Sequence, residues 1–453
     1  MERAIWMALA AVVAAFWVLG GAGYGGEDAV RIETESEQQA GKGAPAQPRW
    51  WKGNLHTHTF WSDGDNYPEV VVDWYKSHGY NFLALSDHNV LSEGDRWLDT
   101  SSGRGTGDAL RQYRERFGDD WVEIRQQDGK TLIRLKPLNE FRKLFEDGRF
   151  LLIQSEEISD SVEGKPVHLN ATNLKEVIPP QGGKTVLEAM QNNVNAVLEQ
   201  RARTGQPMFP HLNHPNFGWA VTAEDLIKLK GEQFFEVYNG HPAVRNHGDR
   251  HHAGAERMWD IILTKRLAEL GGEVMFGIAV DDAHNYLQYR SDRANPGRGW
   301  VVVRAPLLTP NSIIAAMERG DFYASSGVVL RDIRFDGKRL SIEIEPEPGV
   351  AYHTMFIGTR RGYDTTSRPI RNDDGGPLAV TREYSAEIGE TLAVVAGLSP
   401  SYALKGDEVY VRAKVISSKV KENPYSEGEV EVAWVQPVIP ETPYRQRGSA
   451  PAK

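Results

Sequence analysis

Short apolar runs alternate with helical patterns through the first two thirds of the chain. Between the runs, apolar residues recur at helical spacing around Val186 to Leu198 and Met258 to Leu267, and a shorter helical pattern covers 69–77. Strands that alternate with helices predict βαβ units and a parallel sheet, and roughly six or seven units over about 270 residues indicate a distorted barrel. The predicted strands are 81–85, 150–153, 167–171, 208–212, 234–238 and 274–280.

Residues 91–148 interrupt this alternation. They contain a glycine-rich loop at 101–107, a charged helical stretch, and a hairpin pattern at 121–126 and 131–136. We interpret this segment as an insertion over one end of the predicted barrel, which covers 50–325 as a whole.

After about Ser325 the pattern changes to short alternating runs that are separated by turn signals such as Asp336-Gly337. Several such strands with turns between them predict an all-β sandwich, which we place at 326–440. The remaining tail, 441–453, is proline-rich and basic, and we expect it to be loose. The predicted strands of the sandwich are 330–335, 340–344, 354–358, 391–396, 409–416 and 430–435.

The first 25 residues have the features of a secretory signal peptide. An apolar run of 15 residues covers 5–19 and small residues follow it, but the run is shorter than the roughly 18–20 residues of a spanning helix. We therefore expect 1–25 to be a signal peptide and the polar segment 26–49 to be a disordered linker. The mature protein would then be periplasmic or secreted, with no membrane span after cleavage; an uncleaved N-terminal anchor is the alternative.

The composition excludes several kinds of site. The chain of 453 residues contains no cysteine, which excludes disulfides, cysteine-ligated zinc, iron–sulfur clusters and thiol nucleophiles. Its formal net charge of -10 argues against a nucleic-acid partner, since polynucleotide binding needs a positive surface. Any metal site must therefore be built from histidine, aspartate and glutamate.

Histidine and acidic residues follow the ends of the predicted strands. A barrel gathers the carboxyl ends of its strands on one face, and residues at i and i+2 of a strand point the same way. Carboxylates that converge without cations would raise one another's pKa, so the pattern predicts bound divalent metal, with ligands that suit zinc, manganese or iron. The residues are His56, His58, Asp63, Asp87, His88, Glu156, Glu157, His168, His211, His214, Asp281, Asp282 and His284.

Two pairs of neighbours leave a choice. Glu156 and Glu157 face opposite ways on one strand, so only one of them can enter the site. The same holds for Asp281 and Asp282, where the i, i+2 relation to His284 favours Asp282.

Two further kinds of residue are candidates for catalysis. His211 lies on a predicted strand, where a histidine is more often packed or in the outer shell of a metal than a direct ligand. Arg290, Arg293 and Arg298 follow the last motif; solvated charge is the default for them, but one, for which we take Arg290, could clamp an anionic substrate.

The motifs resemble those of the polymerase and histidinol phosphatase (PHP) superfamily. His-Thr-His-Thr-Phe-Trp-Ser-Asp-Gly at 56–64 and Ser-Asp-His-Asn at 86–89 are similar to its first two motifs. Segments 157–159, 214–215 and 282–284, together with His168, are similar to the later ones and occur in the same order. The match at 157–159 favours Glu157 over Glu156 as the residue that enters the site.

The resemblance implies a distorted (β/α)7 barrel of PHP type with two or three divalent ions. It implies one ion held by His56, His58, Glu157 and Asp282, a second held by Glu157 as a bridge with His168 and His214, and a third held by Asp63, His88 and His284. Asp87 would orient these groups or handle a proton. An exported chain with a sandwich looks most like the branch of carbaryl hydrolases, the CehA/McbA type.

These predictions favour a metal-dependent hydrolase that needs no serine or cysteine nucleophile. Bound ions would lower the pKa of water toward about 7 and polarise the substrate. On family grounds we expect a small, anionic substrate that is a phosphoester. The rival hypotheses are a carbamate, ester or amide hydrolase on the same site, and a non-catalytic envelope protein that binds metal or glycan. The oligomeric state is left open.

Overall fold

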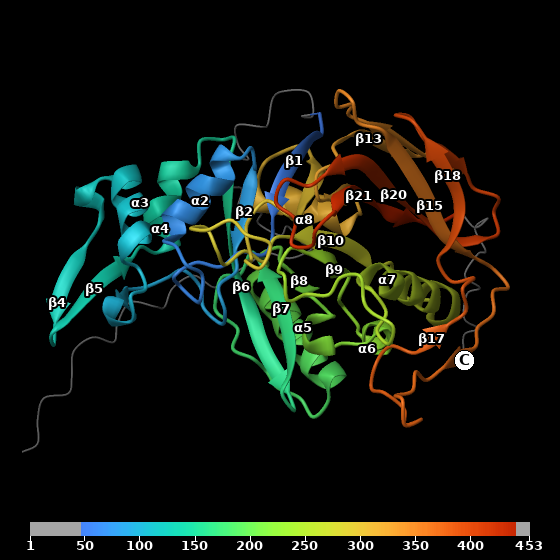
Figure 1. The fold of residues 1–453 in the computed structure, drawn as a ribbon, viewed down its shortest axis with the longest axis horizontal. Helices are drawn as coiled ribbons and strands as arrows, with labels where there is room; N and C mark the ends of the chain where they lie inside the picture. The colour runs from blue at the N-terminus through green and yellow to red at the C-terminus, as the bar shows by residue number, and fades with distance from the viewer. Residues whose placement is uncertain (1–46, 441–453) are drawn as a thin grey trace, which may run out of the picture. The chain divides into compact units, whose positions relative to one another are not determined.

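The computed structural model describes residues 47–440. The predicted signal peptide, most of the predicted linker and the predicted tail lie outside the described residues, at 1–46 and 441–453. Within the described range the chain has a mixed α/β fold (Figure 1), and none of its helices is both long enough and apolar enough to cross a membrane.

One large sheet runs through the described part of the chain. Its strands follow the order β10-β9-β8-β7-β6-β2-β1-β11-β12-β21-β20-β15-β18, so residues that are far apart in the sequence pair side by side. The first seven strands are β1 (Arg49–Asn54), β2 (Phe82–Leu85), β6 (Leu151–Val162), β7 (Lys165–Thr172), β8 (Phe209–Leu212), β9 (Phe234–Asn239) and β10 (Phe276–Val280).

β7 is antiparallel to both of its neighbours, whereas the other neighbouring pairs among the first seven strands are parallel. It pairs antiparallel with both β6 and β8, whereas β1, β2 and β6 pair in parallel, as do β8, β9 and β10. A two-residue turn joins β6 to β7, and both of its residues, Glu163 and Gly164, have positive φ, at 50° and 77°, as tight hairpins require. The predicted parallel sheet therefore has an antiparallel strand at β7, because such a turn leaves no room for a crossover helix.

The segments that follow β1 and β10 lie beside each other. His58 N donates a hydrogen bond to Ala283 O at 3.0 Å, and Asp282 N donates to His56 O at 3.1 Å. Thr57 and Ala283 form a parallel bridge between the same segments. The carboxyl ends of the first and last strands of the seven are thus joined by backbone hydrogen bonds.

The helices pack against this sheet with their apolar faces. α5 (Val186–Thr204) begins after Thr185, whose hydroxyl accepts a backbone hydrogen bond, and ends at Gly205 with a φ of 68°, which are the expected caps. Val194 of this helix belongs to the same buried cluster as Leu212 of β8. The helical patterns at 186–198, 258–267 and 69–77 are confirmed. The other helices are α2 (Pro68–Ser77), α6 (Ala223–Lys228), α7 (Ala255–Thr264), which continues as a π-helix (Lys265–Leu270), α8 (Pro310–Glu318) and the 3-10 turn Phe217–Trp219.

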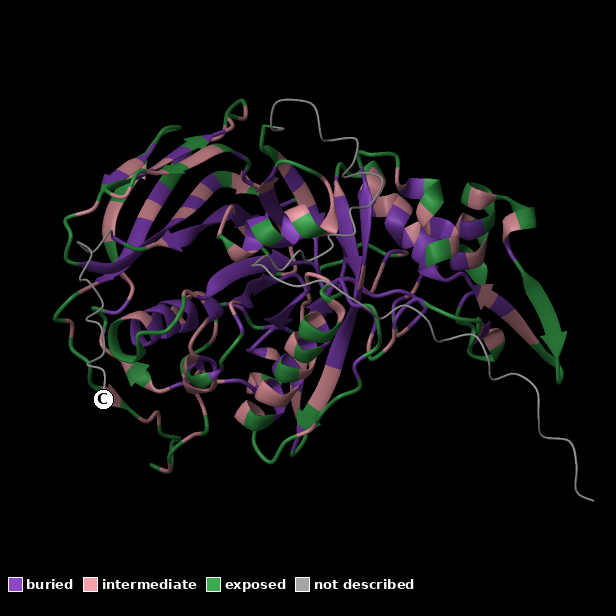
Figure 2. Cartoon of the chain, turned by 180° about the vertical axis from the view of Figure 1, so that it is seen from behind, coloured by how far each residue is buried: buried purple, intermediate pink, exposed green. Residues whose placement is uncertain are grey.

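The segment 91–148 forms a small sheet and two helices. β4 (Ile124–Gln127) and β5 (Lys130–Leu135) are the predicted hairpin, and β3 (Arg96–Asp99), which the sequence pattern did not predict, pairs with β5. Its apolar residues share a cluster with Trp61, which lies in the loop after His58. β4 is exposed along its whole length (Figure 2). The helices of this segment are α3 (Gly107–Phe117) and α4 (Leu138–Phe145), with 3-10 turns at Thr100–Ser102 and Asp119–Trp121.

The strands after residue 325 continue the main sheet. β12 pairs antiparallel with β21, so the sheet is continuous across the boundary that we predicted between barrel and sandwich. A second sheet of β13, β14 and β19 packs on these strands, and the two share a buried cluster that includes Leu340, Phe356 and Val411. The two strands that precede this boundary are β11 (Trp300–Ala305) and β12 (Phe322–Ser325). The strands that follow it are β13 (Leu330–Phe335), β14 (Arg339–Ile344), β15 (Tyr352–Arg360), β16 (Ser367–Arg368), β17 (Glu383–Tyr384), β18 (Glu390–Ala396), β19 (Ser401–Ala403), β20 (Glu408–Val420) and β21 (Val430–Val438).

Candidate metal centre

His56 and His58 follow β1 and point into a common centre. Both side chains are fully buried. Their Nε2 atoms each lie 3.2 Å from Asp282 Oδ1, and 3.6 and 3.5 Å from Glu157 Oε2. The four residues come from the ends of β1 and β10 and from β6, so the topology of the sheet, and not proximity in sequence, brings them together.

These four atoms lack hydrogen-bond partners. Nε2 of His56 and His58, Oε2 of Glu157 and Oδ1 of Asp282 are buried, and none of them makes a hydrogen bond with a described residue. Their close neighbours are one another and His88, whose Nδ1 lies 2.7 Å from Glu157 Oε2. An unpaired buried polar atom costs about 1–3 kcal/mol, and four that converge require a shared partner. Ligand atoms of a tetrahedral zinc site with bonds of about 2.0–2.1 Å lie roughly 3.3 Å apart, so this arrangement fits a divalent cation.

Glu157 connects this group to a second one. Its other oxygen, Oε1, lies 2.9 Å from His168 Nδ1 and 3.4 Å from His214 Nε2, and accepts a hydrogen bond from Asn213 Nδ2 at 2.8 Å. Because β7 pairs antiparallel with β6, His168 lies opposite Ser159, two residues from Glu157. One carboxylate thus faces two sets of histidines, which is the position of a bridging ligand.

A third group lies nearer the surface. Asp63 Oδ1 is 3.3 Å from His284 Nε2 and 3.5 Å from His88 Nε2, and the His284 ring stacks on His58 at 4.0 Å between centroids. The Asp63 side chain is 58% exposed, so this group forms the rim of the site. These residues, with His58, have ligand atoms close enough to share one ion.

The carboxylates and histidines of the centre shift one another's pKa. Burial alone would lower the pKa of His56 and His88, but the neighbouring carboxylates, above all Asp282 for His56 and Glu157 for His88, raise the first well above its usual range and the second to about 10. Burial alone would raise the pKa of Glu157 and Asp282, but the neighbouring histidines, above all His168 for Glu157 and His56 for Asp282, hold both pKa values well below their usual range. Burial lowers the pKa of His58 to about 3, and the adjacent His284 adds to this shift. Ionised carboxylates beside a neutral imidazole are the donor set that a divalent ion prefers.

The alternative neighbours point away from the centre. Glu156 Oε1 accepts a hydrogen bond from Ile178 N at 2.6 Å. Asp281 accepts hydrogen bonds from Tyr75 and from the backbone of 297–299. Glu157 and Asp282 are therefore the members of each pair that face the histidines, as the motif match favoured for Glu157 and the i, i+2 spacing for Asp282.

Asp87 lies behind the centre and holds a loop. Its Oδ1 accepts hydrogen bonds from Thr59 N, Ser62 N and Ser62 Oγ, and its Oδ2 accepts one from Thr59 Oγ1, all at 2.6–3.0 Å. Burial raises its pKa although these donors oppose the shift. Of the two roles that we considered, this geometry fits orientation of the loop that carries His58 and Asp63.

Two of the predicted catalytic residues are not brought to the cavity. Arg290 is 59% exposed, pairs with Asp292 at 2.9 Å, and does not line the cavity at the metal centre. His211 is fully buried but lies deeper than the ligands, where its Nε2 is 3.4 Å from Glu236 Oε1. Arg298 is also buried, and it donates to carbonyls such as Gly240 O at 2.9 Å.

The cavity at the centre has a volume of about 240 Å³. Sequence reasoning missed two of its residues, Phe217 and His241. His241 follows the end of β9, which is the same kind of position that identified the other histidines, so that signal was present. The lining residues are Asp63, His88, Glu157, His168, His214, Phe217, His241, Asp282 and His284.

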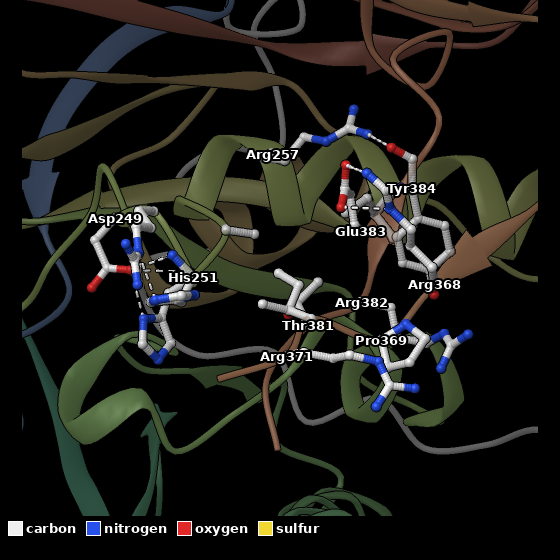
Figure 3. A pocket seen from close by; sticks show the side chains of 15 residues that line it. Asp249, His251, Arg257, Arg368, Pro369, Arg371, Thr381, Arg382, Glu383 and Tyr384 are labelled. Atoms are coloured by element: carbon white, nitrogen blue, oxygen red, sulfur yellow. Dashed lines mark hydrogen bonds and ion pairs between the residues drawn. The ribbon is translucent and has the colours of Figure 1, made fainter. Parts of the chain in front are cut away.

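A larger cavity lies elsewhere (Figure 3). It has a volume of about 730 Å³ and is lined by residues around the start of α7 and by the segment 368–384. It contains none of the predicted site residues. Two of its arginines already pair with acids, Arg368 with Glu383 at 2.8 Å and Arg250 with Asp373 at 2.7 Å. Size alone therefore does not identify the candidate site, whereas the chemistry of the lining residues does.

No protein-family model matches the chain, and no curated protein is significantly similar to it. Several solved structures match it, among them the following two. One is a two-domain protein from Bacteroides vulgatus that contains a predicted PHP-like metal-dependent phosphoesterase; it shares 15% identity, with a TM-score of 0.38 and coverage of 81% of this chain and 90% of that chain. Another, from Bifidobacterium adolescentis, is described as a metal-dependent phosphoesterase; it shares 13% identity, with a TM-score of 0.26 and coverage of 52% and 89%. At TM-scores below 0.5, neither match bears on the activity of this chain.

Proposed function

We propose that this chain is a metal-dependent hydrolase of the PHP type that binds two or three divalent ions. The observation that carries the proposal is the convergence of four buried, unpartnered ligand atoms from His56, His58, Glu157 and Asp282, which belong to three separate strand segments. We propose further that the seven strands form a distorted (β/α)7 barrel, closed where the segments after β1 and β10 meet, and that the C-terminal strands form a sandwich.

Nine side chains would hold the ions. His56, His58, Glu157 and Asp282 would bind one ion, Glu157 would bridge to a second, and the rim group would bind a third. The bridging role is supported by the two oxygens of Glu157, which face different histidines. The complete set is His56, His58, Asp63, His88, Glu157, His168, His214, Asp282 and His284.

Divalent ions bound here would supply hydroxide from water at neutral pH and polarise the oxygen of the scissile bond. The surrounding side chains would determine where in the cavity the ions and the substrate lie. Asp87 holds the loop that carries His58 and Asp63, and Phe217, whose ring lies 5.1 Å from that of His214, covers one wall of the cavity. A cavity of about 240 Å³ is smaller than the roughly 300 Å³ at which drug-sized pockets begin, so only the reacting group of a substrate would enter.

We propose a small phosphoester as the substrate, with an ester, amide or carbamate as the second candidate. The second candidate is supported by the lining itself, which contains no lysine or arginine among the described residues. An anionic phosphoryl group would depend on the ions alone for charge neutralisation, whereas a neutral carbamate needs no cationic side chain. We also propose that the protein is exported, because of the apolar run in the first 25 residues.

Metal analysis paired with a substrate panel tests this proposal. The full chain should bind at least one equivalent of zinc, manganese or iron and should hydrolyse p-nitrophenyl phosphate, bis-p-nitrophenyl phosphate or a naphthyl carbamate. Activity should disappear after chelation and return when metal is added. Cleavage of the carbamate alone would favour the second candidate. Less than one equivalent of metal per chain would overturn the proposal and support a non-catalytic protein.

His56→Ala and Glu157→Ala should each lower kcat/KM more than 100-fold, beyond the about 10–100-fold typical of an outer-shell change. Circular dichroism should show that the fold persists. His353→Ala is the matched control, because His353 is an exposed histidine on β15, outside the centre. Unchanged turnover in either of the first two variants would contradict the assigned site.

A further inference from the structure

A buried carboxylate that none of the motifs includes lies directly behind His56. Glu236, on β9, is 1% exposed. Its Oε1 is 2.7 Å from His56 Nδ1, while His56 Nε2, on the opposite side of the same ring, faces Asp282 Oδ1 at 3.2 Å. The imidazole therefore stands between Glu236 and the proposed metal.

Both oxygens of Glu236 are surrounded by donors. Oε2 accepts hydrogen bonds from the backbone N–H of His214 at 2.7 Å and from Asn239 Nδ2 at 2.8 Å. Oε1 faces His56 Nδ1, and His211 Nε2 lies 3.4 Å away. An ionised carboxylate can only accept, so the short contact to His56 requires the proton of a neutral His56 ring to be on Nδ1.

We propose that Glu236 is a positioning residue that fixes the tautomer and the orientation of His56. With the proton on Nδ1, the lone pair of Nε2 is directed at the centre and is ready to bind an ion. A carboxylate that holds the far side of a ligating histidine in this way also raises the basicity of the ligand. This inference deepens the proposed function and rests on it for the identity of the metal ligand.

The same carboxylate also reaches two other proposed ligands. His214, whose backbone N–H it accepts, has a φ of 20°, which is rare for a residue other than glycine, so the hydrogen bond helps to hold that conformation. Asn239 Nδ2 also donates to Asp282 Oδ2 at 3.0 Å. One buried side chain is thus connected to ligands from three segments, which are those after β1, β8 and β10.

Glutamine at this position would reverse the tautomer. An amide has one acceptor oxygen and one donor nitrogen, and the backbone N–H of His214 cannot turn away. The amide oxygen must therefore take the place of Oε2, and the NH₂ group must face His56. His56 would then have to accept at Nδ1 and carry its proton on Nε2, where the proton blocks metal binding.

The test compares Glu236→Gln with Glu232→Gln in the full chain. Glu232 is the matched control because it is buried just before β9 at 1% exposure, accepts a hydrogen bond from Phe234 N at 2.6 Å, and does not contact the centre. Long-range ¹H–¹⁵N NMR of the metal-free protein reports the tautomer of His56, whose signals are identified by their loss in His56→Gln. Zinc affinity is measured by competition with a chromophoric chelator.

We expect a proton on Nδ1 of His56 in the wild type and in Glu232→Gln, and an Nδ1 without a proton, with Nε2 protonated, in Glu236→Gln. Zinc affinity should fall about 10–100-fold in Glu236→Gln alone, and Glu236→Asp, which keeps an acceptor, should retain the wild-type tautomer. A purely structural role would lower the melting temperature of Glu236→Gln without changing the tautomer, and that result would overturn the proposal.

The wild-type spectrum decides the matter even if Glu236→Gln does not fold, because an Nδ1 without a proton at His56 in the metal-free wild type contradicts the assignment. Failure of the proposed function looks different. In that case the wild type would bind less than one equivalent of zinc while His56 still carried its proton on Nδ1.

Discussion

Replacing Asp260 by asparagine would test whether a buried ion pair holds the C-terminal strands to α7. Asp260 on α7 and Arg412 on β20 are 4% and 1% exposed. The two carboxylate oxygens accept hydrogen bonds from Arg412 Nε and Nη2, both at 2.7 Å, and Tyr410 Oη donates to Oδ1 at 2.7 Å. Asparagine keeps the shape of the side chain but removes the charge that compensates the guanidinium.

The expected loss of stability is about 3 kcal/mol. Removing one partner of a buried ion pair costs about 3–5 kcal/mol, since the other charge is left uncompensated. Here the cost falls at the lower end of that range, because Glu256 Oε2 lies 3.7 Å from Arg412 Nη1 and still opposes part of its charge. Replacing both partners removes the uncompensated charge, so Asp260→Asn with Arg412→Met should be clearly more stable than Asp260→Asn alone.

Urea denaturation of the full chain, followed by tryptophan fluorescence, measures both variants. Glu345→Gln is the control, because its partner Arg331 is 57% exposed and exposed pairs contribute little; its midpoint should equal that of the wild type. A loss below about 1 kcal/mol in Asp260→Asn, or a double variant as unstable as the single one, would refute the reasoning that desolvated charge dominates this contact.

Two other changes are informative. Asp87→Asn puts a donor where the carboxylate now accepts hydrogen bonds from Thr59 and Ser62, so kcat/KM should fall about 10–100-fold. Asp120→Asn, at an exposed aspartate, is the control and should have no effect. Equal turnover in both variants would exclude a role of Asp87 in orienting the loop. Burial lowers the pKa of Lys421 to about 8, although Glu429 opposes the shift. The charged Lys421 therefore lowers the free energy of unfolding fully below pH 8, and this destabilisation is relieved as the pH rises toward 10.5, the pKa in the unfolded chain. The stability of the wild type relative to Lys421→Met should therefore rise by up to about 3 kcal/mol over that range, and a flat difference in urea denaturation would contradict this.

The local pattern predicted the elements but not how they pair. The helix at 186–198 and the hairpin in the insertion follow from periodicity and turn residues, which are local signals. β11 and β12 were not predicted as strands, and they are the ones that join the first seven strands to β21. β1 pairs with β11 across about 250 residues of sequence, as Trp51 opposite Val303 illustrates, and no period in a single chain encodes such a register.

The candidate ligands could be predicted because their signal is positional. Polar residues at the ends of apolar strands need a hydrogen-bond partner, water or a bound ion. The i, i+2 spacing of His56 and His58 indicated that both side chains point the same way. Arg290 failed to reach the cavity for the opposite reason. It lies in a loop with no periodic constraint, and the nearby carboxylate of Asp292 is a partner that it reaches without entering the site.

Glu236 is a charged residue within an apolar strand pattern, and this position alone distinguishes it in the sequence. It lies inside the apolar run 234–238, where a carboxylate needs compensation by donors or must stay protonated. Glu156, also within a strand, has a single backbone donor, and burial raises its pKa to about 8. Burial opposes ionisation of Glu236 as well, but His56, His211 and the other donors around it lower its pKa to about 2. The sequence marks Glu236 as an exception within an apolar run and Glu156 as one of two adjacent acids after such a run. Only the neighbours that the fold supplies distinguish Glu156 from Glu236, for which we propose a role in orienting His56.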